Sequence, residues 1–162
     1  MDHPEVYLST NTLGTLNILN CMKEFEVNKI LLASTSSLYA GLPMPFHEEL
    51  PVNTPISPYA ASKKAAEMMA YTYYHLYKLN VIVARFFTVY GPMGRPDMSI
   101  LRFIKWIDCH EPIELFGDGS QTRDFSYVQD VADGSIIASE MSNGYEVFNI
   151  GGGNKPTSML EI

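Results

Sequence analysis

Two short runs of apolar residues constrain the fold of this chain more than any other feature. One lies within Lys29–Ser34, and the other lies within Val81–Phe87, where only Arg85 interrupts it. Neither run alternates with polar residues, which is typical of strands buried on both faces. A helical segment separates them, and the order strand, helix, strand predicts a parallel pair in an α/β domain.

Helices are predicted on both sides of the first strand. Apolar residues cover much of the circumference of Asn11–Phe25, which indicates burial on more than one side. Ser57 and Pro58 suit the N-cap and first position of a helix that runs to about Tyr77. Further along we expect helices at Ile100–Ile107, at about Val131–Met141 and from Ser158 to Ile162, and short strands at Glu114–Phe116, Arg123–Tyr127 and Glu146–Ile150.

Composition and charge exclude several classes of function. A chain of 162 residues with 46% hydrophobic residues can bury a sizeable core as one domain. Its net charge of −7, without a basic cluster, argues against nucleic acid or an anionic membrane as the main partner. Cys21 and Cys109 stand alone and the four histidines lack metal-ligand spacing, so we expect no disulfide framework and no metal site. With no signal-peptide pattern and no apolar run of about 18 residues, a cytoplasmic protein is expected.

The segment Ser57–Lys63 carries the strongest chemical signal. It sets Tyr59 and Lys63 four residues apart, so their side chains share one face of the predicted helix. A free phenol has a pKa of about 10, and bringing a phenol to neutrality requires about 4 kcal/mol. An ammonium about 4 Å away supplies a contribution of this size at an effective dielectric constant of about 20. The pair is suited to removing a proton from a sugar or alcohol hydroxyl, although its spacing alone would favour an exposed helical pair without function.

Three further residues occur in a sequence order that is compatible with a shared site around this pair. Asn11 lies upstream on a helix, Thr35 lies at a strand end and Arg123 lies downstream between a turn and a strand. Together these residues resemble the extended short-chain dehydrogenase/reductase family, specifically its nucleotide-sugar epimerases and dehydratases. The resemblance runs through 11–15, 33–39, the tyrosine-lysine helix, 85–92, 123–125 and 149–151.

The resemblance implies a partial Rossmann-like parallel sheet flanked by helices, within about 1–95. The remainder, about 96–162, would be mostly a small α/β substrate-binding region, with the strand 146–150 returning to the sheet. The chain would form a single fragment domain whose N-terminal nucleotide-binding half is missing.

The resemblance also assigns roles to the residues around the tyrosine. It makes Tyr59 the base that deprotonates the sugar 4-hydroxyl and Lys63 the residue that holds the nicotinamide ribose. Thr35 would relay the proton, and Asn11 would complete the catalytic group. Ser34 and Phe86, with Tyr59 and Lys63, would contact NAD. Without the resemblance, Thr35 would be read as a cap at the end of the strand.

On the substrate side, the resemblance makes Arg123 the clamp on the diphosphate, where a bidentate fork suits phosphate oxygens. Thr88 and Arg95 match positions that line the sugar pocket, Ser36 and Ser37 would also contact the substrate, and Phe116 would lie near the uracil. Each has a simpler alternative. Arg123 could form a surface ion pair, Arg95 could be a solvated loop charge, and Phe116 could belong to the core.

Two features select a reaction within the resembled family. Gly94–Met98 is most similar to UDP-glucuronate 4-epimerases, so the resemblance implies interconversion with UDP-galacturonate through a 4-keto intermediate, with NAD taking and returning the hydride. Dehydratases carry an Asp-Glu pair where this chain has Ser36 and Ser37, and decarboxylases carry Glu at the second place. Epimerisation is therefore favoured, with UDP-glucose 4-epimerase or another nucleotide-sugar epimerase as the alternative.

The glycine-rich nucleotide fingerprint of that family lies before the segment that Asn11 matches. The nearest pattern here, Gly151–Pro156, has proline in place of the third glycine. We therefore expect a fragment of a larger enzyme that is inactive alone and does not bind the NAD held by its full-length parent. A homodimer is expected through helices 11–25 and 59–77 or through the exposed sheet edge. The alternative is a truncated, non-catalytic oligomerisation or ligand-binding module.

Overall fold

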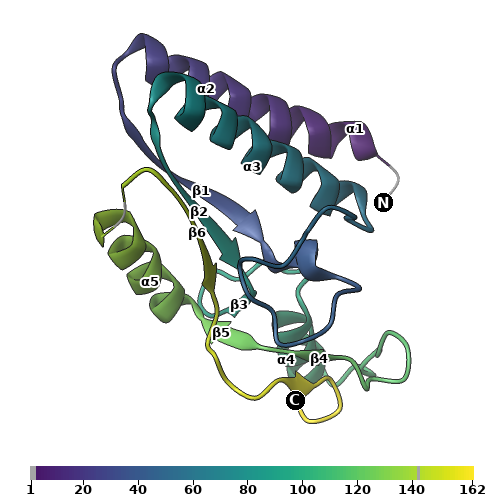
Figure 1. The fold of residues 1–162 in the computed structure, drawn as a ribbon. Coiled ribbons are helices and arrows are strands. Elements are labelled where there is room, and N and C mark those ends of the chain that lie inside the picture. The colour runs from purple at the N-terminus through teal and green to yellow at the C-terminus, as the bar shows by residue number, and fades with distance from the viewer. Residues whose placement is uncertain (1–2, 142) are drawn as a thin grey trace. The chain divides into compact units, whose positions relative to one another are not determined.

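A three-stranded parallel sheet organises the first of two units into which the chain divides (Figure 1). The computed structural model describes residues 3–141 and 143–162. The first unit comprises Met1–Phe86 and Ser135–Ile150, and the second comprises Phe87–Gly134 and Gly151–Ile162. The sheet has the order β1 (Lys29–Thr35), β2 (Asn80–Phe86), β6 (Tyr145–Ile150), all parallel. Residues 81–84 of β2 are fully buried, as expected for a central strand covered on both faces.

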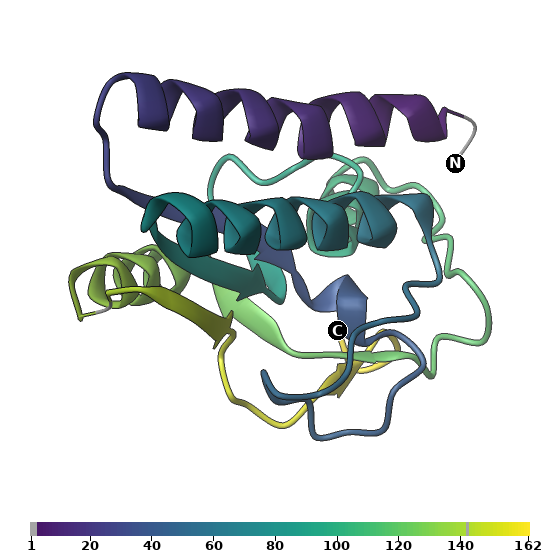
Figure 2. The ribbon, with the colours of Figure 1, turned by 45° about the horizontal axis from the view of Figure 1, so that its top comes forward.

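Two helices lie side by side against this sheet (Figures 1 and 2). The first is continuous from α1 (Pro4–Tyr7) through a π-helical segment, η1 (Leu8–Leu13), into α2 (Gly14–Glu24). The second is α3 (Pro58–Tyr77), which contacts β1 and β2. A hydrophobic core joins the helices to the sheet and consists of Leu19, Met22, Ala70, Tyr73, Leu79, Val81 and Val83.

The strand register brings three carboxyl ends to one edge of the sheet. Thr35 at the end of β1 pairs with Phe86 at the end of β2, and Phe86 pairs with Ile150 at the end of β6. A 3₁₀ turn, η2 (Ser36–Tyr39), follows β1 directly. The carboxyl edge of an open parallel sheet is where ligands bind in α/β proteins, so this edge locates the candidate site.

The second unit contains two small sheets and an amphipathic helix. β3 (Thr88–Tyr90) pairs in parallel with β5 (Phe125–Tyr127), and β4 (Thr122–Arg123) pairs antiparallel with β7 (Thr157–Ser158). The helix α4 runs over Ser99–Asp108. The helix α5 (Val128–Met141) crosses the boundary between the units.

The structure confirms the α/β fold and the parallel pair, and it corrects several boundaries. The first helix begins at Pro4 rather than Asn11. The segment Glu114–Phe116 forms no strand, because its exposed side chains have no sheet to join. The predicted strand Arg123–Tyr127 is divided between β4 and β5. The helix predicted from Ser158 is also absent, since Ser158 ends the strand β7 and a turn follows it.

Candidate active site

The N-terminal end of α3 places Tyr59 and Lys63 on one helical face. The Ser57 hydroxyl oxygen accepts a hydrogen bond from the Ala60 amide at 3.1 Å, and Pro58 occupies the first turn. This is the N-cap arrangement predicted from the sequence, and it fixes where the helix begins. Tyr59 and Lys63 then follow one turn apart.

Lys63 reaches from α3 to the carboxyl end of β1. Its Nζ donates a hydrogen bond to the Ala33 carbonyl at 3.0 Å. The side chain is half-buried, and burial lowers the pKa of Lys63 from its ordinary value. The ammonium therefore lies beside the strand end at which Ser34 and Thr35 follow.

Asn11 is linked to the backbone of Tyr59 through Ser62. The Asn11 Nδ2 donates to the Ser62 hydroxyl at 2.9 Å, and that hydroxyl donates to the Tyr59 carbonyl at 2.8 Å. Asn11 lies in the π-helical segment η1, a local geometry that is frequent at functional sites. The structure thus brings Asn11 and the tyrosine-lysine turn of α3 together, with the fully buried Ser62 as the bridge.

The predicted residues of the strand ends have distinct surroundings. Thr35 is buried, and its Oγ1 accepts a hydrogen bond from the Ser37 amide at 3.1 Å, so it caps η2. A hydroxyl that accepts this bond still has its own proton to donate. Ser36 and Ser37 form the first residues of η2, and Phe86 ends β2 beside Thr35.

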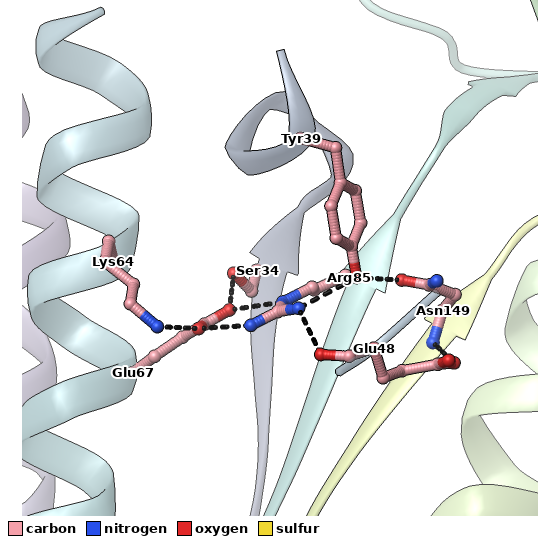
Figure 3. Close-up of polar contacts among 7 residues, drawn as sticks. All are labelled: Ser34, Tyr39, Glu48, Lys64, Glu67, Arg85 and Asn149. Atoms are coloured by element: carbon pink, nitrogen blue, oxygen red, sulfur yellow. Dashed lines mark hydrogen bonds and ion pairs between the residues drawn. The ribbon is translucent and has the colours of Figure 1, made fainter. Parts of the chain in front are cut away.

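Ser34 does not present its hydroxyl to an open site. Its Oγ donates to Glu67 Oε1 at 2.6 Å in a buried contact. Glu67 also forms a bidentate ion pair with Arg85, in which Arg85 Nε lies 3.0 Å from Oε1 and Nη2 lies 2.9 Å from Oε2 (Figure 3). The predicted role of Ser34 in NAD binding thus competes with a buried structural contact that was not predicted from the sequence.

Glu67 and Arg85 are almost completely removed from solvent, with 1% and 3% of their surfaces exposed. Burial alone would raise the pKa of Glu67, but the hydrogen bonds from Arg85 and Ser34 outweigh it and hold that pKa below its ordinary value. One signal for this pair was present in the sequence. An arginine inside an otherwise apolar strand requires a buried partner.

The network continues from Arg85 to the third strand (Figure 3). Arg85 Nη1 donates to the Tyr39 hydroxyl at 2.8 Å, and that hydroxyl donates to Asn149 Oδ1 at 2.8 Å. The Asn149 amide in turn donates to Glu48 Oε1 at 2.6 Å. Polar contacts therefore connect α3, the ends of all three strands and the loop that precedes α3.

In the second unit, a pocket of about 130 Å³ brings Thr88 and Arg95 together. Met98, Ile104 and Phe125 also line it. The Arg95 guanidinium forms a bidentate pair with Asp97, with distances of 2.8 and 2.7 Å, and both side chains are exposed. The hydrogen bonds from Arg95 lower the pKa of Asp97.

Arg123 and Phe116 both lie at the surface of the second unit. The Arg123 side chain is exposed, and its Nη1 donates to the Thr122 carbonyl at 2.9 Å. Phe116 is 70% exposed, so the alternative of a core residue is wrong. The Arg102 guanidinium lies 5.4 Å from its ring centre.

Two classes of site have no candidate in the described part of the chain. Among residues 3–141 and 143–162, no three His, Cys, Asp or Glu side chains gather where a metal ion could be held. No helix in the same residues combines the length and the apolar character needed to cross a membrane. Cys21 and Cys109 are exposed free thiols.

Comparison with known proteins finds relatives of the whole chain. The chain is 59% identical over 162 residues to a UDP-glucuronate 4-epimerase from Thermodesulfobacterium geofontis, and the match covers 100% of this chain and 50% of that relative. It is 40% identical over 142 residues to a probable UDP-glucuronate 4-epimerase from Rhizobium meliloti, a match covering 87% of this chain and 42% of the relative.

Solved structures agree with the sequence relatives. A UDP-glucuronic acid 4-epimerase from Bacillus cereus, in complex with UDP-glucuronic acid and NAD, superposes with a TM-score of 0.89 at 36% identity, over 95% of this chain and 49% of that chain. A dTDP-glucose 4,6-dehydratase from Streptomyces venezuelae, with NAD bound, gives a TM-score of 0.92 at 29% identity, over 98% and 49%.

The chain spans about half the length of the relatives it matches. The family of NAD dependent epimerases and dehydratases matches residues 1–151. With this match over most of its length, the chain belongs to the NAD dependent epimerase/dehydratase family.

Proposed function

We propose that this chain is the catalytic portion of an NAD-dependent nucleotide-sugar 4-epimerase whose substrate is UDP-glucuronate. One observation carries the proposal: Tyr59 and Lys63 share a face of α3, and Lys63 Nζ contacts the Ala33 carbonyl near the carboxyl end of β1. The relatives named as UDP-glucuronate 4-epimerases support the choice of reaction and substrate.

Each candidate catalytic residue of the first unit has a role in this reaction. Tyr59 takes the proton from the sugar 4-hydroxyl, and the Lys63 ammonium stabilises the phenolate that does so. Thr35 relays the proton with the hydroxyl hydrogen that its capping contact leaves available. Asn11, through Ser62, holds the backbone of the turn that carries Tyr59.

The residues present fit one end of NAD. Phe86 ends β2, and Lys63, one helical turn after Tyr59, contacts β1 near its carboxyl end, where a nicotinamide ribose would be held. When bound, NAD would accept the hydride from the sugar and return it. The sequence contains no glycine-rich fingerprint for the pyrophosphate, so tight binding requires groups outside this chain.

The second unit supplies groups for the uronate and the diphosphate. Thr88 and Arg95 line one pocket, and a guanidinium that already binds the Asp97 carboxylate in bidentate fashion has the geometry for a sugar carboxylate. Arg123 would clamp the diphosphate, and the exposed ring of Phe116 would stack near the uracil. UDP-glucose is the alternative substrate. It lacks the carboxylate that Arg95 would bind, so the role of Arg95 distinguishes the two substrates.

A second candidate function is a non-catalytic module that keeps the fold without binding NAD. The missing fingerprint favours it for this chain in isolation. Either function is compatible with a homodimer through residues 11–25 and 59–77, where Leu13, Ile18, Met68, Tyr71 and Leu76 are exposed, or through the unpaired edge of β1. Sedimentation over a range of concentrations measures this association.

A chimera tests the proposal directly. In it, this chain replaces the matching segment of the Thermodesulfobacterium geofontis relative, and the remainder of that relative is retained. We expect the chimera to interconvert UDP-glucuronate and its 4-epimer, as followed by chromatography of the nucleotide sugars. A folded chimera that binds NAD but leaves UDP-glucuronate unchanged would contradict the proposal and favour the non-catalytic module.

A further inference from the structure

Lys63 and Glu67 contact consecutive residues of β1. Lys63 Nζ donates to the Ala33 carbonyl, and one helical turn later the Glu67 carboxylate accepts from the Ser34 hydroxyl. The stripe of α3 that carries Tyr59, Lys63 and Glu67 therefore runs in step with the end of the strand. A shift of α3 along β1 by one residue would break both contacts.

The contact made by Lys63 is poorly suited to hold this register by itself. It is a single hydrogen bond from a flexible four-carbon side chain that is only half-buried, so water can compete for both partners. The contacts of Glu67 differ in kind. They are buried, they use both carboxylate oxygens, and their partner Arg85 lies on the central strand.

Arg85 is itself held from the side opposite Glu67. Its Nη1 donates to the Tyr39 hydroxyl and, at 3.3 Å, to the Glu48 carbonyl (Figure 3). The Tyr39 hydroxyl then donates to Asn149 on β6. The guanidinium of the β2 residue Arg85 is therefore held by η2, by the loop that precedes α3 and, through Tyr39, by β6. The charged groups facing the Glu67 carboxylate are Arg85 and, at 3.5 Å, Lys64.

We propose that the buried pair of Glu67 and Arg85 is a positioning device that sets the register of α3 on β1 and thereby holds Lys63 against Ala33. Glu67 and Arg85 are positioning residues, since they act on the site through Lys63 and the helix that carries it. This inference rests on the proposed function, because Lys63 belongs to the proposed site. Its test requires neither NAD nor turnover, so it can fail independently of that function.

The test follows the titration of Lys63 in the chain itself. Lysine labelled at Cε and Nζ reports each ammonium by nuclear magnetic resonance, and the Lys63 signal is identified by its loss in Lys63→Arg. The main variant is the double substitution of Glu67→Met with Arg85→Met, which replaces the buried pair by apolar side chains and can keep the free energy of folding. Glu67→Gln and Ser34→Ala are measured beside it.

A matched control separates positioning from general loss of stability. Tyr73→Phe removes the hydrogen bond from the Tyr73 hydroxyl to Asn20, which also ties α3 to a neighbouring element of the same unit. It leaves Glu67, Arg85 and Ser34 intact. If the titration midpoint of Lys63 responded to any general loss of stability, it would shift in Tyr73→Phe as well as in the other variants.

We expect the titration midpoint of Lys63 to move upward, toward that of an exposed lysine, in the double variant and in Glu67→Gln, and to a smaller extent in Ser34→Ala. It should not move in Tyr73→Phe. Where Glu67→Gln fails to fold, the double variant decides, because it removes the ion pair without leaving a buried charge. An unchanged midpoint in the folded variants, or an equal shift in Tyr73→Phe, would overturn the proposal.

Discussion

The Glu67 carboxylate and the Arg85 guanidinium form a bidentate pair inside the first unit, with N–O distances of 3.0 and 2.9 Å. The pair joins α3 to the central strand β2, and less than a twentieth of either side chain is exposed (side chains 1% and 4%). Removing one partner of such a pair leaves the other charge buried without compensation. A single substitution in this pair should therefore lower the free energy of unfolding.

Glu67→Gln should lower the free energy of unfolding by about 3–5 kcal/mol, because it leaves the Arg85 charge buried and uncompensated. Urea denaturation of the chain at neutral pH measures this change. Asp97→Asn is the matched control, since Asp97 forms the same bidentate contact with Arg95 at an exposed position. The control should change stability little. Equal losses in both variants would show that burial does not set the cost.

Acid should destabilise the chain through the same pair. The pKa of Glu67 in the folded chain lies below its ordinary value of 4.5, so the unfolded chain binds this proton at higher pH. The stability from the pair is then fully present above pH 4.5 and is lost as the pH falls through the lowered pKa. Urea denaturation at several acidic pH values should show a steeper loss than in the double variant of Glu67→Met with Arg85→Met. Parallel losses would contradict this prediction.

Arg95 should set the preference for a uronate. In the chimera, Arg95→Met should lower kcat/KM for UDP-glucuronate about 10- to 100-fold relative to UDP-glucose, because a charged hydrogen bond contributes about 1.5–3 kcal/mol. Asp97→Asn retains the guanidinium and should keep the preference. The two ratios of kcat/KM provide the measurement. A preference that survives Arg95→Met would assign the carboxylate to another group.

The chain alone should not bind NAD with micromolar affinity, because its sequence offers no glycine-rich turn for the pyrophosphate. Isothermal titration calorimetry of the chain and of the chimera compares the two directly. We expect saturable binding only in the chimera. Micromolar binding by the chain alone would mean that Lys63 and its neighbours hold the cofactor without the fingerprint.

The sequence predicted those elements whose signals are local. Ser57 and Pro58 mark the start of α3 by capping chemistry, and the apolar runs mark β1 and β2 by their burial on both faces. The spacing of Tyr59 and Lys63 then followed from the helix. These features depend on residues close together in the chain, so the sequence alone was sufficient.

The remaining features depend on contacts between distant segments. Glu67 and Arg85 are 18 residues apart, and only the packing of α3 on β2 brings them together. The strand β3 is only three residues long, and its partner β5 lies far along the chain. It is too short for its hydrophobic periodicity to predict a strand. The helix expected from Ser158 was wrong because pairing of β7 with β4 outweighs local propensity.

Tyr59 is the residue on which the proposed reaction depends most, and its substitution in the chimera is the most direct measurement. Tyr59→Phe should lower turnover of UDP-glucuronate by about 100- to 10,000-fold while leaving the affinity for the nucleotide sugar unchanged. Tyr7→Phe is the control, since the Tyr7 ring centre lies 5.8 Å from that of Tyr59 and the proposed reaction assigns Tyr7 no role. Unchanged turnover in Tyr59→Phe would contradict the assignment of Tyr59 as the base.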